Sequence, residues 1–224
     1  AEKIRNYLVQ SYVKHVVLVG GGYISFELSE NVRALGKSVT MVEMYGYPLH
    51  RAFDEDMKDL IISTLERGGV NLKLGSAVKT FEAEGGKVKR AVLENGETID
   101  GDAFILAPGI RPEVSLAEAA GIRIGETGAI WTDDHLRTNF SDIYAIGDAA
   151  ETVDLVTGKR VWMPFAPAAN KMGYVAGTNI AGGDMVFPGV VKTNVTAAFG
   201  TFFAGTGLTE RDAAREGFKP ISAK

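Results

Sequence analysis

The chain has 224 residues, of which 46% are hydrophobic and 23% are charged, with a formal net charge of -4 at pH 7. This profile is typical of an ordinary globular protein with one large or two small domains. The absence of a basic block argues against a nucleic acid or an anionic membrane as the main partner. No apolar run approaches the ~20 residues of a membrane span, and a cytoplasmic location is the default expectation. Because the sequence contains no cysteine, disulfides, thiolate metal sites and thiol redox steps are excluded within these residues.

The first informative pattern is a strand, a glycine turn and a helix. Residues 16–19 are an uninterrupted apolar run, which is typical of a parallel strand covered on both faces. Gly20, Gly21 and Gly22 follow at once. Gly20 can adopt dihedral angles that a side chain would forbid, and Gly22 lets the backbone approach a pyrophosphate closely. The N-terminus of the next helix would then present free N–H groups and a positive dipole end to the phosphates.

This pattern continues into a second strand that ends in an acid. Ser25 occupies the place of the third glycine in a G-x-G-x-x-G fingerprint, and apolar residues then recur at helical spacing. A strand at 39–42 is followed by Glu43. A carboxylate there can accept hydrogen bonds from both hydroxyls of an adenine ribose and would repel a 2′-phosphate, which favours NAD over NADP. The alternative interpretation of this whole pattern is a structural glycine-rich turn that binds no ligand.

The segment between Glu43 and residue 109 predicts the rest of the same domain. Asp54 is placed to be the N-cap of a helix whose apolar stripe spans 57–65. The patterns then predict a strand, a small antiparallel meander and a return to the parallel sheet, at 70–74, 77–99 and 103–106. The last strand runs into Gly109, and the carboxyl ends of strands in an open α/β sheet border the ligand crevice.

The second half of the chain predicts shorter elements. A helix is expected at 113–120, and strands are expected at 128–131 and 143–146. The second of these strands leads into Gly147 and Asp148. The glycine allows close approach of a ligand, and the aspartate can hold a polyol hydroxyl; a helix-capping role is the alternative for Asp148. Near the end we expect a strand or hairpin within 190–203, and then a capped helix that begins after Thr209 and runs through Arg215.

Four segments carry a resemblance to a known family. They are GGGYIS-x-E with its downstream Glu43, LAPGIRPE at 106–113, TNFSDIYAIGD at 138–148 and PFAPAANKMG at 164–173. In their order and spacing the chain resembles the flavin-dependent pyridine nucleotide-disulfide oxidoreductases over essentially its whole length. Within that family it is most similar to the branch of coenzyme A disulfide reductases, NADH oxidases and NADH peroxidases.

The resemblance implies an α/β fold with a Rossmann-like NAD(P)-binding domain, which contains a parallel sheet, helices and a β-meander. We expect this domain at 14–109, after a lead-in segment at 1–13. Residues 110–183 would be the second segment of an FAD-binding domain, and 184–224 the start of an α+β C-terminal dimerisation domain. In this family the first segment of the FAD-binding domain carries a glycine-rich phosphate loop and, nearby, the redox cysteine. None of the 224 residues matches that segment or that cysteine. We therefore expect a central fragment that is inactive alone and that belongs to a homodimeric enzyme.

The resemblance also implies roles for individual residues. The positions expected to bind NAD are Gly20, Gly22, Tyr23, Ile24, Glu27, Glu43 and Gly109. Tyr23 would cover the flavin until nicotinamide displaces it, and Glu27 would lie near the junction of the two cofactors. The positions expected to bind FAD are Gly147, Asp148, Ala168 and Ala169. Asn170 sits where some relatives contact the substrate, although a polar residue in the first turn of a helix is an equally good interpretation.

The functional hypothesis is an enzyme that moves hydride from NADH to FAD. Electrons would then pass to a small disulfide such as coenzyme A disulfide or a persulfide, or to oxygen or peroxide. Two alternatives stay open: a non-catalytic NAD-binding module, and a flavin reductase that serves a protein electron carrier. No metal site is expected, because the three histidines have no ligand spacing.

Overall fold

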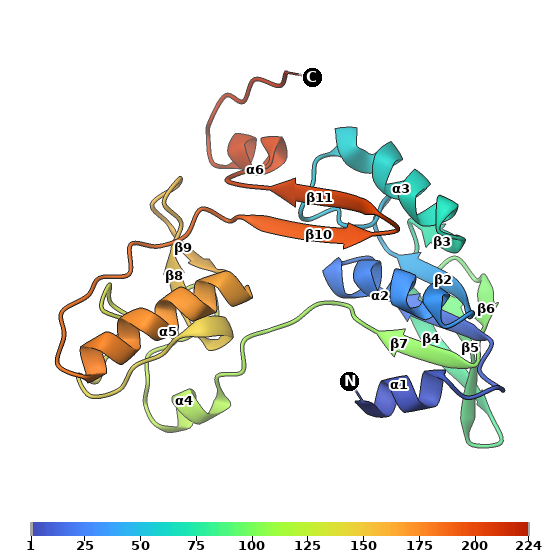
Figure 1. The fold of residues 1–224 in the computed structure, drawn as a ribbon, viewed down its shortest axis with the longest axis horizontal. Coiled ribbons are helices and arrows are strands. Elements are labelled where there is room, and N and C mark those ends of the chain that lie inside the picture. The colour runs from blue at the N-terminus through green and yellow to red at the C-terminus, as the bar shows by residue number, and fades with distance from the viewer. Residues whose placement is uncertain (1, 224) are drawn as a thin grey trace. The chain divides into compact units, whose positions relative to one another are not determined.

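The computed structural model describes residues 2–223, which form two compact units (Figure 1). The first unit contains the residues up to Ile110 together with Val195–Gly205 and Thr209–Arg211. The second unit contains Arg111–Asn194, Thr206–Leu208 and the residues from Asp212 onward. A segment near the end of the chain therefore belongs to the unit that the N-terminal half builds.

The first unit is organised around a four-stranded parallel sheet with the order β3-β2-β1-β7 (Figure 1). Its strands are β1 (His15–Val19), β2 (Ser38–Glu43), β3 (Val70–Leu74) and β7 (Ala103–Leu106). The central strand β1 is apolar and its middle residues are fully buried, as expected for a strand paired on both sides and covered on both faces. The predicted parallel sheet is confirmed.

Helices and a meander complete this unit. The helical segments are α1 (Glu2–Leu8), α2 (Tyr23–Ala34), the 3₁₀ turn η1 (Glu55–Met57) and α3 (Lys58–Arg67). The strands β4 (Val78–Glu84), β5 (Lys87–Leu93) and β6 (Thr98–Asp100) form the predicted antiparallel meander. The connection from β1 through α2 to β2 is the predicted βαβ unit.

A hairpin from the C-terminal part of the chain packs into the core of the first unit. It consists of β10 (Asn194–Ala198) and β11 (Thr201–Gly205). Of the two forms expected within 190–203, a strand or a hairpin, the structure has the hairpin, and it extends two residues further. The Phe203 ring is 1% exposed and lies edge-on to Phe53, with centroids 6.0 Å apart. Ala198 is fully buried in the same core.

The short helix α6 (Glu210–Arg215) follows the hairpin and corrects one prediction. The Asp54 carboxylate does not cap the helix that follows it. It instead accepts hydrogen bonds from the backbone N–H groups of Glu210, at 2.6 Å, and Arg211, at 3.3 Å. Asp54 is thus an N-terminal cap, but for a helix 156 residues further along the chain.

The second unit contains short elements around one longer helix. These are α4 (Ser115–Ala119), the 3₁₀ turn η2 (Gly147–Ala149), the antiparallel pair β8 (Glu151–Val153) and β9 (Arg160–Trp162), and α5 (Ala166–Ile180). The helix α5 buries Met172, Val175 and Ala176 against Leu136 and its neighbours. The helix expected at 113–120 is confirmed, with bounds a few residues shorter.

The strands expected at 128–131 and 143–146 are wrong. Among the described residues these segments form only isolated bridges, which pair Ile130 with Ile124 and with Ala150, and Tyr144 with Arg137. Gly128, the first residue of one segment, has a φ of +83°, which does not fit an extended strand. Leu136, whose carbonyl accepts a hydrogen bond from the N–H of Ala145 in the other segment, has a φ of +67° and does not continue a paired strand.

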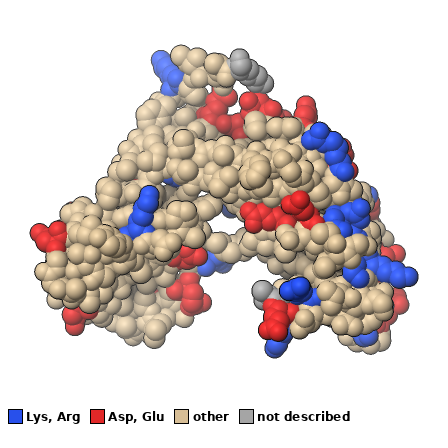
Figure 2. Space-filling model, viewed as in Figure 1, with Lys and Arg blue, Asp and Glu red and all other residues tan. Residues whose placement is uncertain are grey.

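Charged side chains of both signs are interspersed on the face drawn in Figure 2. Within residues 2–223, no helix combines the length and the apolar character that crossing a membrane requires.

Candidate functional site

The glycine turn after β1 has a conformation that explains its first residue. Gly20 has a φ of +99°, and a Cβ there would lie 2.4 Å from the carbonyl oxygen of Ala107, just after β7. Its N–H donates to the carbonyl of Val42 at 2.8 Å. A side chain is therefore excluded both by the backbone conformation and by the close approach of the neighbouring strand ends.

Gly22 is different, because its backbone would accept a side chain. Its φ is -75° and its ψ is -176°, and a Cβ there would meet no described atom within 4 Å. Gly22 is the N-cap of α2 and has no side chain to occupy the capping position. A helix N-terminus that begins beside such an open glycine is the arrangement that binds phosphate groups. A Cβ at Gly109, after β7, would also meet no described atom within 4 Å.

The Glu43 carboxylate closes the other side of this turn. It is 7% exposed, and its two oxygens accept hydrogen bonds from the N–H groups of Gly21, at 2.5 Å, and Tyr45, at 2.8 Å. Each carboxylate oxygen has more than one acceptor position, so both can also accept a hydroxyl. The structure therefore brings together the two features on which the dinucleotide prediction depended, the glycine turn and the acid at the end of β2.

The loop after Glu43 contains a stacked pair of rings. The Tyr45 and His50 rings lie 4.4 Å apart and nearly parallel. Burial and the nearby charge of Arg211 lower the pKa of His50. The Arg211 guanidinium donates to the His50 backbone carbonyl at 2.7 Å. The sequence alone did not reveal this cation, because Arg211 lies 161 residues beyond His50.

Three predicted site residues lie on the first two turns of α2. The Ile24 side chain is 50% exposed. Burial, followed by the charge of Glu27, raises the pKa of the Tyr23 phenol to about 12. Glu27 Oε1 accepts a hydrogen bond from the hydroxyl of Thr196, on β10, at 2.8 Å. No sequence pattern singled out Thr196.

The predicted flavin-binding residues gather at one place in the second unit. Gly147 has a φ of +67°, and a Cβ there would lie 3.4 Å from Cβ of Ala169. The turn η2 therefore lies against the first turns of α5. The Asp148 side chain is exposed, while its backbone carbonyl accepts a hydrogen bond from the Trp162 indole at 2.7 Å.

The start of α5 has the features expected of a helix end that faces a ligand. A proline stands in its first turn, and its N-cap residue makes no side-chain cap hydrogen bond. Ala168 is 9% exposed, whereas Asn170 is exposed. The residues present fit the group that was expected there, because a helix N-terminus lies against Gly147 and the nearby side chains of Ala168 and Ala169 are small.

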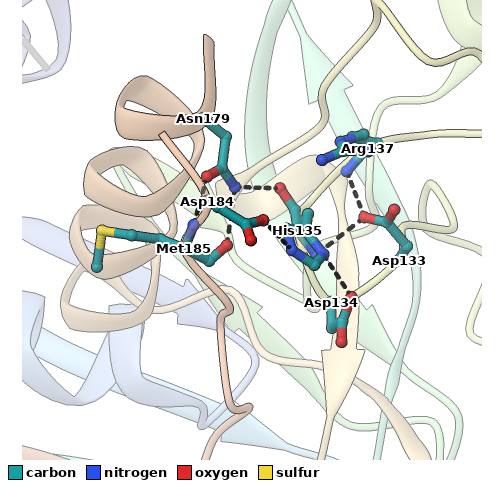
Figure 3. Close-up of polar contacts among 7 residues, drawn as sticks. All are labelled: Asp133, Asp134, His135, Arg137, Asn179, Asp184 and Met185. Carbon is teal, nitrogen blue, oxygen red and sulfur yellow. Dashed lines mark hydrogen bonds and ion pairs between the residues drawn. The ribbon is translucent and has the colours of Figure 1, made fainter. Parts of the chain in front are cut away.

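A separate polar cluster surrounds His135, as Figure 3 shows. Its ring nitrogens are hydrogen-bonded to Asp134, at 2.7 Å, and to Asp184, at 2.9 Å. These bonds, the Asp134 bond above all, raise the pKa of His135. The Asn179 amide joins the same segments, because it donates to the His135 carbonyl at 3.1 Å and to the Met185 carbonyl at 2.9 Å (Figure 3).

Within the described part of the chain, Asp133, Asp134 and His135 are a group whose possible metal-ligand atoms lie within 4.8 Å of one another. Both ring nitrogens of His135 are already engaged by carboxylates, and Asp133 accepts hydrogen bonds from the N–H groups of His135 and Arg137. These hydrogen bonds join the loop that contains His135 to the segment that contains Asp184, and we call this set of contacts the His135 clasp.

Comparisons with known proteins agree with this geometry. Residues 1–173 match the family described as pyridine nucleotide-disulphide oxidoreductase. The sequence is 46% identical over 215 residues to an NAD(P)H coenzyme A polysulfide/persulfide reductase of Pyrococcus horikoshii, covering 96% of this chain and 48% of that protein. It is 37% identical over 207 residues to an NADH oxidase of Methanocaldococcus jannaschii, covering 92% of this chain and 45% of that protein.

A solved structure is also similar. The NAD-dependent persulfide reductase of A. fulgidus superposes with a TM-score of 0.92 at 40% identity, covering 96% of this chain and 40% of that one. The chain spans about half the length of the curated relatives that it matches.

Proposed function

Because the chain belongs to the pyridine nucleotide-disulphide oxidoreductase family, we propose that it supplies the NADH-binding domain and part of the FAD-binding domain of an oxidoreductase. The observation that carries this proposal is the contact of the Glu43 carboxylate with the N–H of Gly21, beside Gly22 at the start of α2. One side of the turn accepts hydroxyls and the other binds an anion, which matches a ribose joined to a pyrophosphate.

The residues of the first unit would bind and orient NADH. The N–H groups at the start of α2 would bind the pyrophosphate, which passes over the open side of Gly22. Glu43 would accept the hydroxyls of the adenine ribose, and this contact favours NADH over NADPH. Tyr23 and Glu27 would border the nicotinamide half of the ligand.

The residues of the second unit would hold part of FAD. Gly147 and the exposed Asp148 carboxylate would contact the flavin side chain, and Ala168 and Ala169 would let the cofactor approach the start of α5. When bound, FAD accepts a hydride from NADH and passes on two electrons. The positive end of the α5 dipole would favour negative charge on the reduced cofactor.

We propose a small disulfide, such as coenzyme A disulfide or a persulfide, or oxygen or peroxide, as the electron acceptor. The names of the relatives support both kinds of acceptor. The 224 residues contain no cysteine, so a thiolate for disulfide chemistry would have to come from outside them. A cytoplasmic location and a homodimeric assembly belong to the same proposal.

Anaerobic mixing of the complete natural protein, loaded with FAD, with NADH tests this function. We expect NADH to bleach the visible flavin absorbance, and coenzyme A disulfide, a persulfide or oxygen to restore it. A flavin that stays oxidised in the presence of bound NADH would overturn the proposal and favour the non-catalytic module. Reoxidation only by an added protein carrier would favour the flavin reductase alternative.

A further inference from the structure

The hydrogen bond between Thr196 and Glu27 joins the C-terminal hairpin to the predicted nicotinamide side of the site. The Thr196 hydroxyl donates to Glu27 Oε1 at 2.8 Å across 169 residues of sequence. The Thr196 side chain is 3% exposed, whereas Glu27 is exposed. A buried donor therefore holds one oxygen of a carboxylate that a ligand can reach.

The hairpin that carries Thr196 is firmly supported. Phe203 packs edge-on against Phe26, and Ala198 is fully buried. The Phe199 ring packs against Gly68, where an added Cβ atom would lie 2.5 Å from the ring atoms. Because the backbone of Thr196 is held by this packing, its hydroxyl has a fixed position. Its hydrogen bond therefore restricts the rotamer of the long Glu27 side chain.

The direction in which the proposed ligand would lie indicates which part of it is near Glu27. Glu43 assigns the adenosine half of the ligand to the end of β2, and Gly22 assigns the pyrophosphate to the start of α2. The nicotinamide half then continues beyond the pyrophosphate. Glu27 is the one acidic residue in the first two turns of α2, one turn after Tyr23, and its charge acts on the Tyr23 phenol.

The two forms of the ligand differ in charge at this place. The nicotinamide ring is neutral in NADH and carries a positive charge in NAD⁺. A fixed carboxylate near the ring therefore stabilises the oxidised form more than the reduced form, and favours the charge that develops as hydride leaves. A mobile, solvated carboxylate does so less.

We propose that Thr196 is a positioning residue that holds the Glu27 carboxylate beside the nicotinamide ring, so that the site discriminates in favour of NAD⁺. This inference rests on the proposed function. It adds a residue from the C-terminal hairpin to the dinucleotide site, and it predicts that the hairpin tunes the relative affinities for the two forms of the nucleotide.

The test is the ratio of the affinities for NAD⁺ and NADH, measured with the full chain. NADH binding is followed by its fluorescence, and NAD⁺ binding by competition. The variants are Thr196→Val, which removes the hydroxyl, Thr196→Ser, which keeps it, and Glu27→Gln, which removes the charge. Thr201→Val, the same substitution on β11, is the matched control. If Thr196→Val fails to fold by circular dichroism, Thr196→Ala takes its place.

We expect Thr196→Val to weaken NAD⁺ binding by about threefold to tenfold relative to NADH binding. Thr196→Ser and Thr201→Val should keep the wild-type ratio, and Glu27→Gln should lower it at least as much as Thr196→Val. An unchanged ratio in folded Thr196→Val, or an equal loss of both affinities, would overturn the inference. A wild-type chain that binds neither nucleotide would instead overturn the proposed function, and the inference with it.

Discussion

Phe203 lies edge-on against Phe26, with ring centroids 5.5 Å apart and an interplanar angle of 89°. Both rings are almost fully buried, so the hairpin shares the core of the first unit. We expect Phe203→Ala to lower the free energy of unfolding by about 3–5 kcal/mol, because it leaves a cavity in this core.

The neighbouring Phe202 is the matched control for that substitution. Its side chain is 77% exposed, so Phe202→Ala should change the free energy of unfolding by no more than about 0.5 kcal/mol. Urea denaturation of the two variants measures both values. Similar losses in both would show that the hairpin does not pack as described.

The Asp54 cap gives a second stability prediction. Asp54→Ala removes the carboxylate that accepts from the N–H groups of Glu210 and Arg211, and it should lower the free energy of unfolding by about 0.5–2 kcal/mol. Glu84→Ala, at the exposed end of β4, removes an acid without removing a cap. An Asp54→Ala variant as stable as Glu84→Ala would contradict the assignment of the cap.

The fold of the first unit was largely predictable because its signals are local. The apolar run of β1, the glycine turn and the acid that ends β2 lie within one continuous stretch of sequence. Residues that act across the chain could not be predicted in the same way. Asp54 had the correct residue type for a cap, but its helix was 156 residues away, and Thr196 is an ordinary strand threonine until the hairpin folds onto α2.

The second unit was less predictable because buried polar residues build part of it. The strand β8 and the residue after it read ETVD, without hydrophobic alternation, yet Glu151 and Asp154 are both buried. The Thr127 hydroxyl donates to Glu151 at 2.8 Å, and Lys192 pairs with Asp154 at 3.0 Å. Partners so distant in sequence leave no local pattern, so this strand was not predicted.

The His135 clasp predicts a pH dependence of stability. Hydrogen bonds to Asp134 and then Asp184 raise the pKa of His135 above its ordinary value of 6.5. A raised pKa means that the protonated histidine stabilises the folded state. This contribution is fully present below the unfolded pKa, and it is lost as the pH rises through the folded pKa.

The measurement is thermal unfolding of the wild type and of His135→Asn over a range from about pH 6 to about pH 8. The advantage of the wild type over the variant should be largest at the acidic end and should shrink as the pH rises. Parallel pH profiles for the two proteins would show that the charge of His135 contributes nothing.

Glu43 predicts the choice of nucleotide. A carboxylate that faces a 2′-phosphate should make NADH bind at least about tenfold more tightly than NADPH, which is about 1.4 kcal/mol. Glu43→Gln removes the charge, while its amide oxygen can still accept from one of the two N–H groups that Glu43 now binds. The preference should therefore relax in the variant. Equal affinities of the wild type for the two nucleotides, measured by titration, would contradict this role.

The central claim is that NADH binds across the open side of Gly22, and a titration of NADH into the Gly22→Val variant tests it most directly. Gly22 has an ordinary φ and open space at its Cβ position, so the variant should fold; Gly177→Val, at another open position, is the control. We expect Gly177→Val to bind NADH like the wild type and folded Gly22→Val to show no binding. Normal NADH binding by folded Gly22→Val would contradict the account, because the valine side chain would occupy the path of the pyrophosphate.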